Sequence, residues 1–156
     1  MNRLGFASMA ILGLANLMAP APVAAQDVGV TGAAQATLPD GASFNGLRLT
    51  GLTLGQGMFI AQDGSATGQF QAVLLGTSLL GAAQNITVEG EVSGGSVGAD
   101  GSATFSGTAT VDMGDGTLPL PGVPFTVTAS AGSLGLILNA VALPTATVTA
   151  GSITVK

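Results

Sequence analysis

Residues 102–113 have the sequence SATFSGTATVDM, and this stretch decides the fold. From Ala103 to Met113, every second position holds an apolar residue or glycine, and the positions between them hold Ser, Thr or Asp. Successive side chains of a β-strand point to opposite faces. The period of two therefore predicts a strand with one buried face and one exposed face.

The preceding segment, residues 86–93, has the same period. Apolar residues and glycine alternate there with Thr, Glu and Ser in the sequence ITVEGEVS. Asp100-Gly101 lies between the two segments, and Asp-Gly tolerates the positive φ angles that tight hairpin turns require. The two segments are therefore predicted to form an antiparallel hairpin.

Asp-Gly pairs begin at positions 40, 63, 100 and 115, each beside strand-like sequence. The string DGSAT occurs at both 63–67 and 100–104, while the residues around the two copies differ. A repeat array needs at least three similar units. We therefore interpret the two strings as shared turn chemistry at two hairpins.

Segments rich in Val and Thr, with Gly and Pro near their ends, predict further strands. The full set is 28–38, 43–54, 57–62, 66–76, 86–93, 102–113, 123–130, 133–139 and 145–155. About nine strands with short connections predict an all-β domain, either an antiparallel β-sandwich or, alternatively, a small closed β-barrel.

Three segments depart from simple alternation. Residues 117–124 contain three prolines and predict an extended crossing segment outside the sheet. Residues 77–84 have a possible Ser or Thr cap before two leucines and predict a turn or two of helix. Residues 72–75 and 134–138 are apolar at successive positions, which predicts that something covers their second face.

The first 25 residues have the order of a secretory signal peptide. Arg3 precedes a helical apolar stretch, prolines follow at 20 and 22, and small residues end at Ala25. We predict cleavage between Ala25 and Gln26 and export of a single all-β domain, residues 26–156, to the periplasm, the cell surface or the medium. The apolar stretch is too short to span a bilayer, so no integral membrane span is expected in the mature chain.

The composition excludes several kinds of partner and chemistry. The chain has no Cys and no His, and beyond residue 25 Arg48 and Lys156 face eight acidic residues, a net charge of −6. This acidic excess repels phosphate backbones and argues against nucleic-acid binding. The absence of disulfides fits a bacterial exported protein. Without His and Cys, triad hydrolysis, thiol chemistry and zinc catalysis are excluded.

Two groups of carboxylates remain as weak candidates for a site. Glu89 and Glu91 lie two apart on one predicted strand, about 6.6 Å apart on the same face, which is close to the spacing found in glycosidases. We favour a solvated strand face for them. Asp112 and Asp115 could offer oxygen ligands to calcium, although Asp-Gly is equally expected in a turn. No other residues are predicted to bind a metal, and no cofactor is expected.

We therefore expect no enzymatic activity. The leading hypothesis is an exported structural or interaction domain that contacts itself or another surface protein, at the cell surface or in extracellular matrix. One alternative is a β module that binds an apolar ligand or calcium, and another is a glycoside hydrolase that uses Glu89 and Glu91. Threonines recur at the same spacing, at positions 108, 110, 126, 128, 145, 147 and 149. We favour an ordinary solvent-facing sheet surface for them; the alternative is an uncharged face that orders water or docks a subunit.

Overall fold

The computed structural model describes residues 27–156, and the regular secondary structure of this range consists of β-strands alone. The strands are β1 (Val28–Thr37), β2 (Ser43–Phe44), β3 (Leu47–Ile60), β4 (Ser65–Thr77), β5 (Ile86–Val97), β6 (Ala103–Asp112), β7 (Leu120–Ala129), β8 (Ser133–Leu138), β9 (Val141–Ala142) and β10 (Ala146–Val155). The prediction of an all-β domain is confirmed. The predicted signal peptide and its cleavage site, Ala25 and Gln26, lie outside the described residues.

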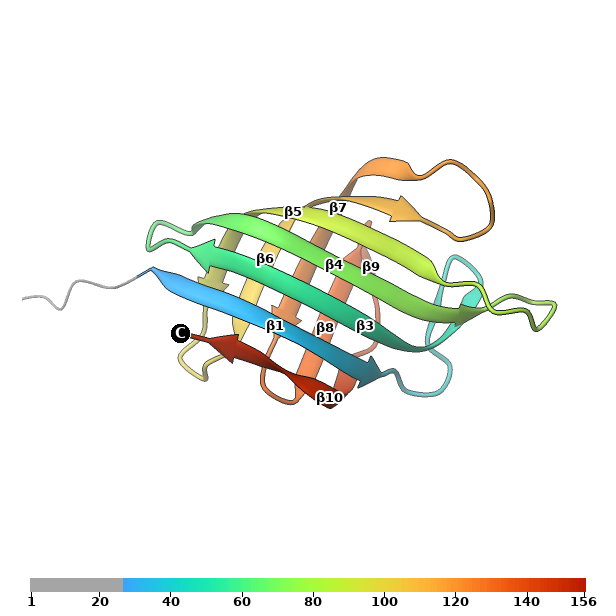
Figure 1. The fold of residues 1–156 in the computed structure, drawn as a ribbon, viewed down its shortest axis with the longest axis horizontal. Helices are drawn as coiled ribbons and strands as arrows, with labels where there is room; N and C mark the ends of the chain where they lie inside the picture. The colour runs from blue at the N-terminus through green and yellow to red at the C-terminus, as the bar shows by residue number, and fades with distance from the viewer. Residues whose placement is uncertain (1–26) are drawn as a thin grey trace, which may run out of the picture.

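Main-chain pairing closes the sheet into a ring (Figure 1). The eight long strands pair antiparallel in chain order, and β1 pairs with both β3 and β10. The short strands β2 and β9 add to β3 and β8. Of the two predicted architectures, the pairing is that of the closed barrel. The barrel is flattened, because β10, β1, β3 and β4 form one wall and β6, β7 and β8 cross behind them.

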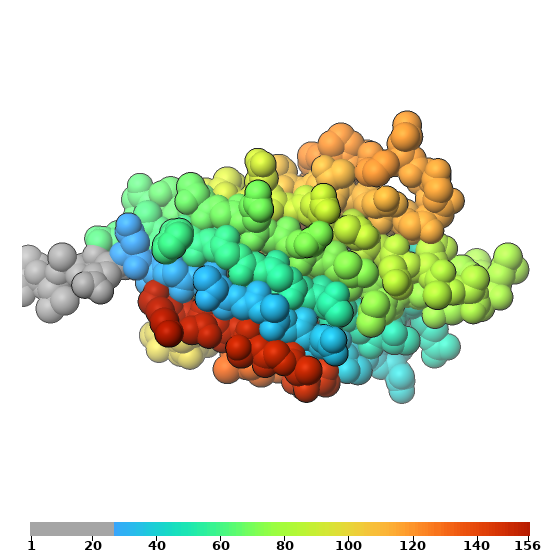
Figure 2. All heavy atoms as spheres, viewed as in Figure 1, coloured from blue at the N-terminus to red at the C-terminus, as the bar shows by residue number. Residues whose placement is uncertain are grey.

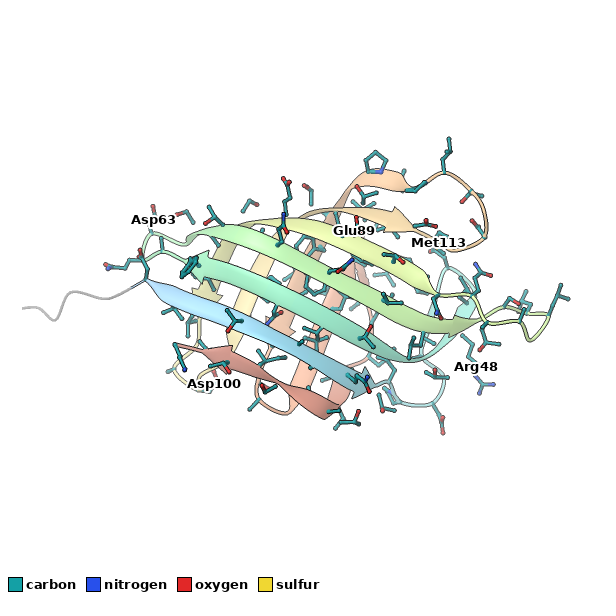
Figure 3. The ribbon with its side chains drawn as sticks, in the orientation of Figure 1. Arg48, Asp63, Glu89, Asp100 and Met113 are labelled. Atoms are coloured by element: carbon teal, nitrogen blue, oxygen red, sulfur yellow. The ribbon has the colours of Figure 1, made fainter. Side chains whose placement is uncertain are left out.

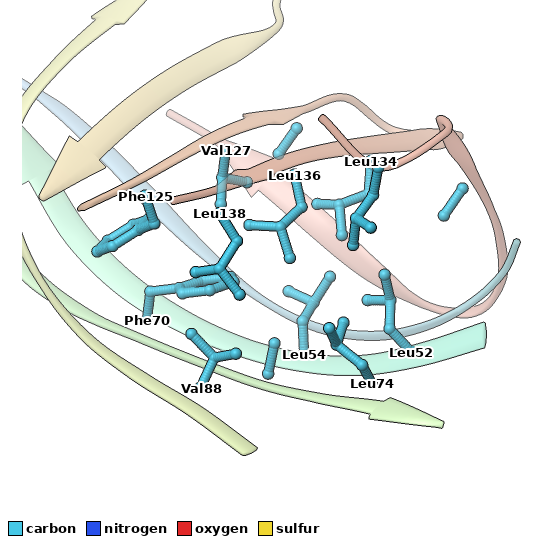
Figure 4. Close-up of a cluster of buried hydrophobic side chains, with 14 of the residues drawn as sticks. Leu52, Leu54, Phe70, Leu74, Val88, Phe125, Val127, Leu134, Leu136 and Leu138 are labelled. Atoms are coloured by element: carbon cyan, nitrogen blue, oxygen red, sulfur yellow. The ribbon is translucent and has the colours of Figure 1, made fainter. Parts of the chain in front are cut away.

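Aromatic and aliphatic side chains fill the interior (Figure 4). Ring centroids are 5.8 Å apart for Phe70 and Phe105 and 5.3 Å apart for Phe70 and Phe125. Buried aliphatic side chains surround this cluster, among them Leu52, Leu54, Leu74, Val88, Val127, Leu134, Leu136 and Leu138. With no disulfide to stabilise the fold, the apolar area removed from water is its main source of stability.

Two inward-facing glycines make room for the Phe125 ring. A Cβ atom on Gly90 would lie 2.6 Å from Cε1 of Phe125. One on Gly107 would lie 3.1 Å from the same atom and would also collide with the backbone oxygen of Glu91. Overfilling a packed interior costs about 1–3 kcal/mol. The glycines that interrupt the apolar faces of β5 and β6 are therefore part of the packing.

The repeated DGSAT strings form the same turn at two hairpins. Oδ1 of Asp63 accepts hydrogen bonds from the N–H (2.9 Å) and hydroxyl (2.6 Å) of Ser65, and Oδ1 of Asp100 accepts the same pair from Ser102 at 3.0 and 2.7 Å. Gly64 and Gly101 have φ angles of +83° and +79°, which glycine adopts without strain. Shared turn chemistry is therefore confirmed.

These hydrogen bonds lower the pKa of Asp100 below its ordinary value of 3.8, first through the Ser102 hydroxyl and then through the Ser102 N–H. Because the pKa is lowered on folding, the interaction stabilises the fold above pH 3.8, and this stabilisation is lost as the pH falls through the lowered pKa.

We expect Ser102→Ala to raise the pKa of Asp100 toward 3.8. Carboxyl-carbon NMR titration would measure this shift. The pKa of Asp63, which is lowered by Ser65 in the same way, should not change and serves as the internal control. An unchanged pKa at Asp100 would contradict the assignment.

The structure corrects the predicted boundaries around β2 and β3. The predicted strand 43–54 is divided at Asn45-Gly46, where both residues have positive φ and Phe44 pairs with Leu47 across a two-residue turn. Conversely, the predicted break at 55–56 is absent, and β3 continues to Ile60. Gly55 and Gly57 stay in the strand, since both of its neighbours, β1 and β4, pair with it there.

Two further expectations were wrong. Residues 77–84 form no helix, because the chain turns at Ser78, whose carbonyl accepts the N–H of Gly81 at 2.9 Å. Gly81 has a φ of +82°, which a right-handed helix does not allow. The proline-rich segment 117–124 is only partly outside the sheet, since β7 begins at Leu120 and pairs there with Val111 of β6.

The two segments that are apolar on both faces keep the alternation of their strands. In β4, Ala72 and Leu74 are buried while Leu75 is exposed, and in β8, Leu136 is buried while Ile137 is exposed. Among the described residues no helix covers these outer positions. Within the same range, no helix is long and apolar enough to cross a membrane.

The two ends of the barrel differ in their connections. Tight turns join β3 to β4, β5 to β6 and β7 to β8, at the end where β1 begins and β10 finishes. Longer connections, which include β2 and β9, lie at the opposite end. Figure 3 shows Asp63 and Asp100 at the tight-turn end and Arg48 and Met113 at the long-loop end.

Candidate functional site

The predicted carboxylate pair lies on the outer wall of the barrel. Glu89 and Glu91 project from β5 into a groove of about 500 Å³, and both are exposed. Gln71 of β4 donates a hydrogen bond from Nε2 to Oε1 of Glu89 at 3.2 Å. On the other side, Thr110 and Thr108 of β6 pair with Glu89 and Glu91 in register. The lining of the groove therefore includes carboxylates, amides and hydroxyls; Figure 3 labels Glu89 on this wall.

The surroundings of the two carboxylates are alike. Glycosidases place their two carboxyl groups in different surroundings, so that one stays protonated while the other is ionised. Glu89 and Glu91 share the same polar, solvent-exposed wall. Both carboxylates are placed to accept hydrogen bonds at the surface.

The second predicted group is engaged in its own turn. Oδ1 of Asp112 accepts the N–H of Gly114 at 2.9 Å, and Oδ1 of Asp115 accepts the N–H and hydroxyl of Thr117 at 2.9 and 2.6 Å. The pKa of Asp115 is lowered, first by the Thr117 hydroxyl. In residues 27–156 no three His, Cys, Asp or Glu side chains gather as a metal site would need.

The threonines lie on two neighbouring strands and one separate strand. Thr108 and Thr110 are on β6, and Thr126 and Thr128 are on β7, which pairs with it. The hydroxyl oxygens of Thr104 and Thr128 are 3.1 Å apart. β8 separates these strands from β10, where Thr147 and Thr149 lie, and Thr145 immediately precedes β10.

Exposed leucines mark the long-loop end. Leu79 and Leu80, between β4 and β5, are 96% and 97% exposed, and Leu118 in the β6–β7 connection is also exposed. The two loops contact each other where Gln84 Nε2 donates to the carbonyl of Met113 at 2.9 Å. These three leucines are the most exposed large apolar side chains in residues 27–156.

The ring of strands is nearly open at one seam. β10 pairs with β1 from Thr147 to Val155, but with β8 only at Ala146 and Thr147. One further bond joins the N–H of Val148 to the carbonyl of Gly132 at 3.0 Å. Beyond it, β10 continues through the lower part of the molecule (Figure 2, red), where atoms of earlier segments are visible below it.

Main-chain hydrogen-bonding groups on one side of the seam have no strand partner within the described part of the chain. Gly29 and Lys156 exchange two hydrogen bonds, of 2.7 and 2.9 Å, so Lys156 directs its main-chain groups toward β1. Orientation alternates along an antiparallel strand, and Val155 and Ile153 therefore direct theirs away from β1. Within residues 27–156, no strand pairs with that side of β10 beyond Thr147. We name residues 149–155, on this side, the open edge.

One polar side chain lies inside the barrel. Gln56 of β3 is 8% exposed, and neither its Nε2 nor its Oε1 has a hydrogen-bond partner in the described chain. It pairs in register with Gly32 of β1, and Gly32 pairs in turn with Ile153 of β10. Gln56 is therefore in one cross-strand row with Ile153, a residue of the open edge.

Sequence reasoning missed both the open edge and Gln56. Each left a signal: residues 149–155 contain no charged residue and no proline, and Gln56 replaces an apolar residue in the inward series Leu52, Leu54, Met58 and Ile60. The predicted strand break at 55–56 concealed the second signal. Comparisons with protein-family models, curated proteins and solved structures find no match to this chain.

Proposed function

We propose that this chain is an exported, non-enzymatic interaction domain that associates with copies of itself. The observation that supports this most directly is the open edge of β10, a row of main-chain donors and acceptors that no strand of residues 27–156 pairs with. Unpaired edges are templates for pairing with another chain, and proteins usually block them with charged residues, proline or a covering element.

The open edge has little of this protection. Residues 149–155 have the sequence TAGSITV, which contains no charge and no proline, and Lys156 follows at the end. Thr, Ile and Val favour extended structure, and a segment without charge does not repel a second copy. The chemistry of the edge therefore supports association through the main chain.

The other candidate features favour contact over catalysis. The chain has no His and no Cys, and Glu89 and Glu91 lie together on one exposed polar wall. The leucines at the long-loop end add an apolar surface without catalytic groups. Export remains part of the proposal and is supported by the sequence of residues 1–25; fractionation between periplasm, cell surface and medium would test it.

Size-exclusion chromatography with light scattering, from micromolar to millimolar protein, tests self-association. We expect the mass to rise with concentration. Val155→Pro removes an N–H that faces the open edge while the pairing of Lys156 with β1 is kept, so we expect roughly tenfold weaker association with the fold retained. Val155→Thr keeps the N–H and should associate as the wild type does. A wild type that stays monomeric throughout would refute the proposal.

A further inference from the structure

We propose that a second copy of this chain pairs with β10 as an antiparallel strand, around a two-fold axis that passes beside Ile153. The proposal rests on the self-association proposed above and specifies its interface. It follows from the direction of the main-chain groups, the charge of the edge and the pairing geometry of antiparallel strands.

The main chain sets the register. Ile153 and Val155 direct their N–H and C=O groups toward the open edge. Gly151, two residues earlier, stays in register with Ala34 of β1 and holds the corresponding position with a φ of +83°. If Ile153 pairs with Ile153 of a second copy, Gly151 of each copy lies opposite Val155 of the other. All three residues then form hydrogen-bonded pairs, about four to six bonds in total. Moving the register by two residues in either direction leaves fewer such pairs.

The side chains are compatible with this register. The side chain of Ile153 is buried in its own barrel, so it stays in place while its main-chain groups pair. Gly151 offers no side-chain bulk opposite Val155. The positively charged Lys156 falls opposite Ala150 of the second copy, which keeps the two lysines apart.

The same register makes Ser152 and Thr154 of the two copies opposite neighbours. Ser152 is exposed and Thr154 half-buried, and on β1 they pair with the uncharged Ala33 and Thr31. The nearest charge on the same face of β10 is Lys156, which both variants below retain. Like charges directly opposite each other destabilise a strand pair, and opposite charges stabilise it. These two positions therefore allow a charge-reversal test with matched variants.

In the first variant, Ser152→Lys with Thr154→Lys, lysine lies opposite lysine at two places in the interface. We expect association at least tenfold weaker than in the wild type. In the second, Ser152→Lys with Thr154→Glu, lysine lies opposite glutamate at the same two places, and we expect association at least as strong as in the wild type. Sedimentation equilibrium measures both, and unchanged far-UV circular dichroism establishes that both are folded. High salt should bring the two variants closer together.

The outcomes separate this proposal from the one on which it rests. If the wild type associates and the two variants do so equally well, the β10 register is refuted and self-association uses another surface. Weakening in both variants also refutes the two-fold register, since opposite charges should not weaken it. A monomeric wild type refutes self-association itself.

Discussion

Replacing Phe70 by alanine is expected to lower the free energy of unfolding by about 3–5 kcal/mol. The Phe70 ring is almost completely buried and packs against Phe105 and Phe125, with centroid separations of 5.8 and 5.3 Å. Its removal loses both the buried area and the aromatic contacts, and it leaves a cavity between the two walls. A loss of this size is a large part of the stability of an ordinary domain.

Urea unfolding followed by far-UV circular dichroism measures this change; the chain has neither Trp nor Tyr to report by fluorescence. Phe59→Ala is the matched control, since Phe59 lies on a neighbouring strand and is 68% exposed. Its effect should stay within about 0.5 kcal/mol. Equal effects at the two positions would show that the interior is not packed as described.

Replacing Gln56 by methionine is expected to have the opposite sign and to raise the free energy of unfolding by about 1–3 kcal/mol. The amide of Gln56 is buried with both polar atoms unpartnered, so folding removes it from water without returning its hydrogen bonds. Methionine has a similar length and fills the same space with apolar atoms.

The same unfolding experiment distinguishes this effect from a general benefit of methionine. Gln69→Met changes the same residue type on the exposed outer face of β4, and it should leave stability nearly unchanged. A Gln56→Met variant that is less stable than the wild type would mean that the amide has a partner in solution, such as an internal water.

The strands could largely be predicted because their two faces differ in polarity. The alternation at 102–113 and 86–93, with Asp-Gly between them, located β5, β6 and their turn. The missed Asn45-Gly46 turn also had a local signal, since Asn-Gly is the preferred pair for a two-residue hairpin. The residues on both sides of this turn are strand-like, so the pattern predicts one continuous strand there.

Other features depend on contacts between distant parts of the chain. Glycines such as Gly55 and Gly57 are typical of the end of a strand. They stay within β3 because β1 and β4 pair with it on both sides. The pairing of β1 with β10, which closes the ring of strands, joins residues more than a hundred positions apart, and no local sequence pattern predicts it. The exposed carboxylates were located correctly on one face of β5, whereas the open edge depends on where β8 stops pairing.

The position of the chain ends has a mechanical consequence. β1 begins and β10 finishes at the same end of the barrel, where Gly29 and Lys156 form the last hydrogen-bonded pair. A pulling force applied between these two ends would load that pair first and then each next pair in turn, so the ladder would unzip instead of resisting in shear. Opening it would free one side of β1 as well, and the number of unpaired strand edges would increase as the barrel came apart.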